Sequence, residues 1–82
     1  MGENKSDAIK AYALLLLANY TLTLREAEVF LWLARGKKNK EIAPLLCMEY
    51  KTVRTHRFNI YKKLKVHSEH ALTEIARGLG LV

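Results

Sequence analysis

Apolar residues recur at three- and four-residue intervals over most of the chain, and short polar or glycine-containing turns separate these periodic stretches. This spacing places the apolar side chains of each stretch on one face of a helix. It predicts helices at about 24–35, 40–47, 50–64 and 68–77. The alternation of apolar and polar residues that is typical of strands does not extend over a useful length. The sequence therefore predicts an all-α fold with four core helices.

Residues that favour helix ends stand where these stretches begin and stop. Thr23 and Glu26 form a predicted capping box, in which the threonine oxygen accepts from the backbone N–H of Glu26 and the carboxylate returns a bond. Gly36 follows the first helix, and Ser68 precedes the last. Pro44 falls inside the stretch at 40–47, where its missing N–H predicts a distorted or shortened helix.

A further apolar stretch lies near the N-terminus. Ser6 favours the start of a helix that would run to about Ala18, and every residue of Ala11–Ala18 is apolar. The run is far shorter than the ~20 residues that cross a bilayer, so we expect no membrane association. A helix without a polar face must be covered, either by its own domain or by a second subunit. We therefore expect an additional N-terminal apolar helix over residues 1–20, for packing or dimerisation, and a second unit over 21–82.

The stretch at 50–64 has two chemically different faces. At 100° per residue, Val53, Ile60 and Leu64 fall within about 40° of one another and form a core-facing stripe. The opposite face carries cations, a hydroxyl and an aromatic ring, on Lys51, Arg54, Thr55, Phe58 and Lys62. An α-helix fits the major groove of B-DNA, where Arg or Lys can bond guanine and a methyl group or ring can touch thymine. The pattern predicts a recognition helix.

Positive charge is concentrated in the same part of the chain. The 82 residues carry a net charge of +6. Between residues 35 and 65, ten Lys and Arg stand against two Glu, a net charge of +8, whereas the remainder of the chain carries −2. A focused basic region indicates a polyanionic partner, although a solvated surface with chance clustering would give the same composition.

The short helix at 40–47 completes the arrangement expected of a helix-turn-helix. A tight turn at Met48–Glu49 would set two helices at a steep angle, so that the first crosses the DNA backbone and the second enters the groove. Free N–H groups at the start of the first helix also favour a phosphate. The residues expected to contact phosphate begin the short helix or flank the recognition face: Lys38, Asn39, Lys40, Thr52, Arg57, Lys62 and Lys63.

Three linked segments resemble the LuxR-type DNA-binding domain, which ends many two-component response regulators and quorum-sensing regulators. They are Leu22–Val29 (LTLREAEV), Gly36–Ala43 (GKKNKEIA) and Lys51–Leu64 (KTVRTHRFNIYKKL), within a likeness that covers about Leu22–Val82. The resemblance implies a four-helix helix-turn-helix domain. It also implies that four residues take the base- and backbone-contacting positions of the recognition helix: Lys51, Arg54, Thr55 and Phe58.

Three positions depart from the pattern of that family. Glu49 stands where Ser or Thr usually caps the recognition helix, and it places a negative charge near the DNA. Lys65 stands where Gly is common, at a point where the chain can need a positive φ. Phe58 is larger and less polar than usual. We favour a thymine-methyl contact for its ring over a contact with another protein or simple exposure.

By the same resemblance, the last helix takes the place that the family often uses to dimerise. Its apolar surface and that of the N-terminal stretch exceed what one small domain readily hides, so we expect a homodimer on DNA. Covering the core within one chain is the alternative for both surfaces. The candidate dimer residues are Ala71, Leu72, Ile75, Leu79, Leu14 and Leu15.

These observations predict sequence-specific binding of duplex DNA by a bacterial transcription regulator that reads the major groove with the helix at 50–65. We expect a cytoplasmic, nucleoid-associated protein. The alternative is a protein-interaction module on the same fold, which binds RNA polymerase or another regulator in a sigma-like role. Because only an apolar segment precedes Leu22, we expect a free-standing domain. Regulation by phosphorylation or by an acyl-homoserine lactone does not carry over to it.

Groups for catalysis or metal binding do not gather in the sequence. His67 and His70 are three residues apart but lack a third ligand nearby, and Cys47 has no His–Asp arrangement to activate its thiol. We therefore expect no enzymatic activity, no cofactor and no metal site.

Overall fold

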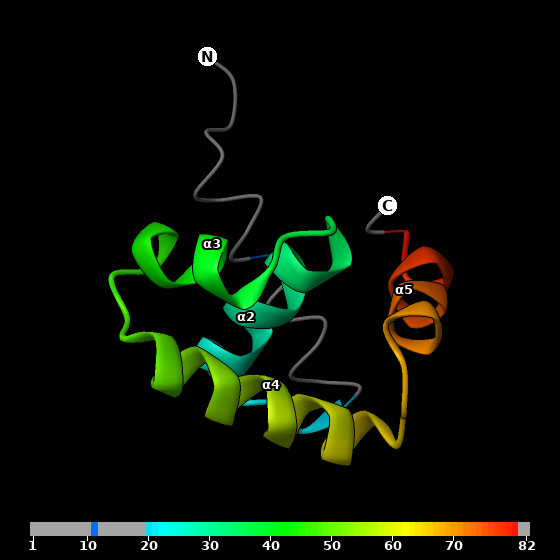
Figure 1. Cartoon of the computed structure of the whole chain (residues 1–82). Coiled ribbons are helices and arrows are strands. Elements are labelled where there is room, and N and C mark those ends of the chain that lie inside the picture. Colours follow the sequence, from blue (N-terminus) through cyan, green and yellow to red (C-terminus); the bar gives the residue numbers. More distant parts are fainter. Residues whose placement is uncertain (1–10, 12–19, 81–82) are drawn as a thin grey trace.

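The computed structural model describes Ala11 and residues 20–80 of the chain, and this part is helical without strands. Its helices, labelled as in Figure 1, are α2 (Leu24–Ala34), α3 (Asn39–Leu45), α4 (Tyr50–Leu64) and α5 (Glu69–Gly78). The all-α fold is therefore confirmed for these residues. Apart from Ala11, the helix expected over Ser6–Ala18 lies outside the described residues, and so do Leu14 and Leu15.

The core forms around α2, which packs against all three other helices. Figure 1 shows α4 extending along one side of the domain, with α3 above its first half and α5 beyond its end. Among the described residues, fifteen apolar ones are buried between the helices, and the largest fully buried side chains are Phe30, Leu22, Ile42, Ile60, Leu72, Val29 and Val53. The stripe expected on the inner face of α4 is confirmed, because Val53, Ile60 and Leu64 are all buried.

The capping box expected at the start of α2 is present. The backbone N–H of Glu26 donates to Oγ1 of Thr23 at 3.1 Å, and the backbone N–H of Thr23 donates to Oε1 of Glu26 at 2.9 Å. Two otherwise unpaired backbone donors are satisfied in this way. The helix ends before Gly36, as expected, and this glycine takes a φ of +83°.

The short helix α3 begins one residue earlier and ends two residues earlier than predicted. It stops one residue beyond Pro44, whose missing N–H removes one bond of the helix, so the expected shortening is confirmed. Cys47 lies outside the helix, exposed and with a φ of +54°, and the N–H of Met48 donates to the carbonyl of Ala43 at 2.9 Å. These bonds close α3 in a Schellman-type turn that leads directly into α4.

Two of the positions that depart from the family pattern, Glu49 and Lys65, lie at the two ends of α4. The side chain of Glu49 makes no capping hydrogen bond to the start of the helix. Lys65 takes a φ of +58°, and the N–H of Val66 donates to the carbonyl of Tyr61 at 3.0 Å. The next helix, α5, begins with the expected cap, in which Oγ of Ser68 accepts from the backbone N–H of Ala71 at 3.1 Å. The C-terminal ends of α3 and α4 are thus both closed by backbone hydrogen bonds.

One of the expected dimer residues is buried within the domain. Leu72 was assigned to a subunit contact, but it is only 2% exposed, because it packs into the core where α5 lies against α2. Ala71 and Ile75 on the same helix and Leu79 directly after its end are half-buried and pack against the core with part of their surface free. These three residues are the ones that an apolar contact at this face would use.

Candidate nucleic-acid interface

The outer face of α4 carries the four residues expected to contact DNA bases. Lys51, Arg54, Thr55 and Phe58 are exposed, and together they line one open hollow of about 400 Å³. The ring of Phe58 is 67% exposed, far more than a large apolar side chain usually is when it has only a packing role. The helix thus presents cations, a hydroxyl and an aromatic ring on one side while its other side is anchored in the core.

Local contacts hold two of these side chains in place. The guanidinium of Arg54 lies over the ring of Tyr50, one helical turn earlier, at 5.9 Å from the ring centroid. The hydroxyl of Thr55 donates to the backbone carbonyl of Lys51 at 3.1 Å. Because this bond uses the hydroxyl proton, the oxygen of Thr55 remains as an acceptor for a donor such as an exocyclic amino group of a base.

One flank of α4 adjoins the start of α3. Here Arg57 lies over the ring of Tyr61 at 5.1 Å, and its Nη2 donates to the hydroxyl of Tyr61 at 3.1 Å. The same Nη2 lies 3.5 Å from Oε1 of Glu69, at the beginning of α5. A hollow of about 220 Å³ at this junction is lined by Lys38, Asn39, Lys40, Tyr50, Arg57 and Glu69. The structure thus brings together four of the residues expected to contact phosphate.

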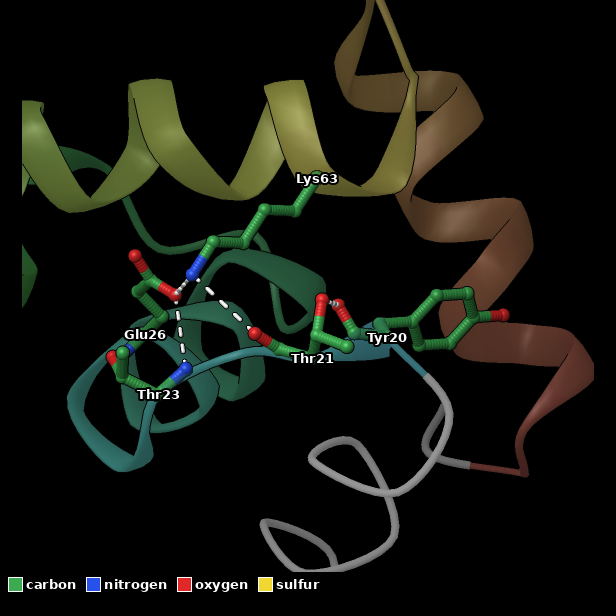
Figure 2. A network of polar contacts seen from close by, with 5 residues as sticks. All are labelled: Tyr20, Thr21, Thr23, Glu26 and Lys63. Carbon is green, nitrogen blue, oxygen red and sulfur yellow. Dashed lines mark hydrogen bonds and ion pairs between the residues drawn. The ribbon is translucent and has the colours of Figure 1, made fainter.

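On the other flank of α4, Lys63 is bound by groups at the start of α2 and just before it. Nζ of Lys63 lies 2.6 Å from Oε1 of Glu26 and 3.3 Å from the backbone carbonyl of Thr21, as Figure 2 shows. These contacts tie the end of α4 to the segment that leads into α2. They oppose the phosphate role expected for Lys63, and we leave this residue out of the proposed interface.

Glu26 is the one charged residue among the buried side chains of the described chain, at 4% exposure. Burial alone raises the pKa of its carboxyl, but hydrogen bonds from Lys63 and Thr23 and the charge of Lys63 outweigh that effect. Its pKa is therefore lowered from the ordinary value of 4.5, so the carboxylate is ionised at neutral pH.

Reasoning from the sequence missed the partners of these cations. Tyr50 and Tyr61 stand four residues from Arg54 and Arg57, a spacing that places side chains next to each other on a helix and could have revealed both stacked pairs. The pair between Glu26 and Lys63 joins two different helices and has no local signal.

Neither a group of metal ligands nor a membrane-spanning helix is found in the part of the chain that the structure describes. Within it, no three His, Cys, Asp or Glu side chains are grouped closely enough to hold a metal ion. Also within Ala11 and residues 20–80, none of the helices has both the length and the apolar character needed to span a bilayer.

Comparison with known proteins places the domain in a family. The profile of the bacterial regulatory proteins of the luxR family matches residues 20–76. The chain is 52% identical over 60 residues to an uncharacterized response regulatory protein, YgeK, of Escherichia coli K12, and 43% identical over 61 residues to the Fimbriae Z protein of Salmonella typhimurium LT2. It is also 51% identical over 47 residues to an uncharacterized transcriptional regulatory protein, YhcZ, of Bacillus subtilis 168.

These matches cover 73%, 74% and 57% of this chain but only 41%, 29% and 22% of the three relatives, so the chain spans less than half the length of each. A search of solved structures found no significant match. The family is one of transcriptional regulators and not of enzymes. With its residues 20–76 matching the family profile and its helices arranged as a helix-turn-helix, the chain belongs to the luxR family of bacterial regulatory proteins.

Proposed function

We propose that this domain binds duplex DNA in a sequence-specific manner, as part of a bacterial transcription regulator, by placing α4 in the major groove. The observation that carries the proposal is the division of α4 into two faces. Val53 and Ile60 are fully buried, whereas Arg54, Thr55 and Phe58 face solvent. The helix is therefore anchored on one side and free to meet base edges with the other.

Each group on the exposed face suits a particular base edge. Lys51 and Arg54 can donate to O6 and N7 of guanine, and Arg54 is already oriented by the ring of Tyr50. Thr55 offers its oxygen to an amino group, and the ring of Phe58 is suited to the methyl group of thymine. The domain should thus prefer sites that contain guanine and thymine at neighbouring positions.

Contacts with the DNA backbone would fix the register of α4 in the groove. We assign them to the polar residues that border the base-reading face and the start of α3, without Lys63: Lys38, Asn39, Lys40, Thr52, Arg57 and Lys62. Such contacts position the protein and carry no sequence information of their own.

A homodimer would double the small surface that a single domain offers to DNA. We propose that Ala71, Ile75 and Leu79 form the contact, because α5 leaves them partly free. The two subunits would then read half-sites about one helical turn apart. Sedimentation of the protein bound to a duplex that carries the full site tests this arrangement. A single subunit bound to a full site would contradict it.

The proposal also assigns a role to each of two units of the chain and a place in the cell to the protein. We assign DNA binding to residues 21–82 and packing or dimerisation to residues 1–20. We place the protein in the cytoplasm on the bacterial nucleoid, since two of its relatives are described as a response regulatory and a transcriptional regulatory protein.

A second candidate function is contact with RNA polymerase or another regulator. It is favoured by a hollow of about 180 Å³ between α2 and α3, lined by Leu31, Trp32, Leu46 and the 49%-exposed Leu45 among others. An exposed apolar surface of this kind is typical of protein contacts. This function could exist beside DNA binding or replace it.

Selection of duplexes from a random pool distinguishes the two candidates. The whole chain should enrich a symmetric site, and Arg54→Ala should weaken binding to that site by about 1–3 kcal/mol and relax its base preference. Arg77→Ala, which removes an exposed cation of α5, serves as the control and should leave the preference unchanged. If no sequence is enriched, the interaction module becomes the better explanation.

A further inference from the structure

The hollow between α3, α4 and α5 contains a carboxylate among cations. Lys38 and Lys40 come from the start of α3, Arg57 from the flank of α4 and Glu69 from the first turn of α5. Three positive charges thus surround one negative charge in a space of about 220 Å³. Among the described residues, Glu69 is the only acidic one that lines this hollow.

Arg57 connects the carboxylate to the expected path of the DNA backbone. Its Nη2 donates to the hydroxyl of Tyr61 at 3.1 Å, and the ring of Tyr61 lies 5.1 Å from the guanidinium carbon. These contacts hold the guanidinium in one orientation. The same Nη2 forms its ion pair with Oε1 of Glu69 at 3.5 Å, a distance that indicates an attraction between charges and not a close hydrogen bond.

A carboxylate and a phosphate compete for the same donors. Arg binds either group through its planar array of N–H donors, so an oxygen of Glu69 stands where a phosphate oxygen would approach. The side chain of Glu69 is 77% exposed, and water and salt screen its pair with Arg57. The contact can therefore be exchanged for a phosphate, at the cost of bringing two negative charges near each other.

We propose that Glu69 is an internal competitor for the phosphate-binding cations of this hollow, and that it lowers the affinity of the domain for all duplexes to a similar extent. The proposal rests on the proposed function, since it assigns a residue that opposes the same DNA contact. Two unit charges about 4 Å apart in water interact strongly enough to change an equilibrium roughly fivefold. Removal of the carboxylate charge should therefore strengthen DNA binding by about that factor.

The test compares Glu69→Gln with Glu74→Gln in the whole chain. Both variants remove one negative charge from α5, but Glu74 pairs with Arg77 on the same helix and does not line the hollow. Binding is measured at low and physiological salt, on the duplex selected by the wild-type protein and on a scrambled duplex. Thermal melting of both variants verifies that they are folded.

We expect Glu69→Gln to bind both duplexes roughly fivefold more tightly at low salt, with the ratio between the two duplexes unchanged, and Glu74→Gln to change binding less than twofold. An equal gain in both variants would overturn the proposal, because it would show a general effect of net charge. Weaker or unchanged binding by Glu69→Gln would overturn it as well.

A measurement without DNA tests the role of Glu69 independently of the proposed function. Inorganic phosphate is titrated into each protein while the side-chain Nε–H signal of Arg57 is followed by nuclear magnetic resonance. We expect a stronger response in Glu69→Gln than in the wild type and in Glu74→Gln. Identical responses would overturn the role of Glu69, whereas failure of the wild type to select any duplex would overturn only the proposed function.

Discussion

Nζ of Lys63 lies 2.6 Å from Oε1 of Glu26, although 37 positions separate the two residues in the sequence. Glu26 closes the capping box of α2, and Lys63 belongs to the last turn of α4. One carboxylate therefore satisfies the start of one helix and holds the end of another (Figure 2). The pair thus ties the C-terminal end of α4 to the start of α2.

Replacing the carboxylate should destabilise the domain. Glu26→Ala removes the bond to the N–H of Thr23 and leaves the ammonium of Lys63 without its anionic partner, so we expect a loss of about 1–3 kcal/mol in the free energy of unfolding. Glu28→Ala is the matched control on the same helix. Its exposed pair with Arg25 spans 3.4 Å, and its loss should cost about 0.5 kcal/mol or less. Urea unfolding of both variants gives the comparison, and equal losses would contradict the role of Glu26.

The lowered pKa of Glu26 makes stability depend on pH in one direction. A carboxyl whose pKa is lower in the folded than in the unfolded chain stabilises the fold above the unfolded value, near 4.5, and loses this contribution as the pH falls through the folded value. The difference in unfolding free energy between the wild type and Glu26→Gln should be constant from neutral pH to about pH 5 and shrink at lower pH. A difference that stays constant down to pH 2.5 would show that Glu26 does not titrate in this way.

Because Lys63 is held by other groups of the protein, we expect it to behave differently from its neighbour Lys62 in DNA binding. Lys62 is exposed on the outer side of α4, whereas the ammonium of Lys63 is held by Glu26 and Thr21. Lys62→Ala should reduce the slope of log affinity against log salt concentration by about 0.9, the value for one phosphate contact. Lys63→Ala should leave that slope unchanged and lower the melting temperature instead. A reduced slope for Lys63→Ala would restore its phosphate role.

Local signals in the sequence predicted much of the fold. The extent of α4 agrees with the structure, and the caps at Thr23 and Ser68 are confirmed because each depends on residues only three positions apart. The unusual backbone at Lys65 was also visible from the residue type alone. These features need no knowledge of how the helices pack.

Predictions that depended on packing were less successful. The apolar stripe at 71–79 placed Leu72 on one face of the helix, but it did not show that Leu72 packs against α2. Nor did it show that Ala71, Ile75 and Leu79 of the same stripe keep part of their surface free. In the same way, a helical projection places Lys63 on a flank of α4 without showing that Glu26 lies beneath it. Which flank of a helix is covered is decided by contacts between distant segments.

The left-handed residue that ends α4 offers a test of the backbone geometry. Lys65 takes a φ of +58°, a conformation that is unfavourable for residues with a Cβ atom and open to glycine. Lys65→Gly should therefore stabilise the domain by about 0.5–1 kcal/mol. Lys62→Gly removes the same charge inside the helix and should destabilise it by about 1 kcal/mol. Chemical denaturation of the two variants should give shifts of opposite sign, and destabilisation by both would contradict the assigned turn.

The proposed function requires above all that the outer face of α4 meets the DNA. The most direct measurement is the change in backbone amide signals when the duplex selected from a random pool is added to the whole labelled chain. We expect the largest changes at Lys51, Arg54, Thr55 and Phe58, with the signals around Trp32 nearly unchanged. If the largest changes lie instead around Trp32, or if α4 does not respond to any duplex, this account of the domain is contradicted.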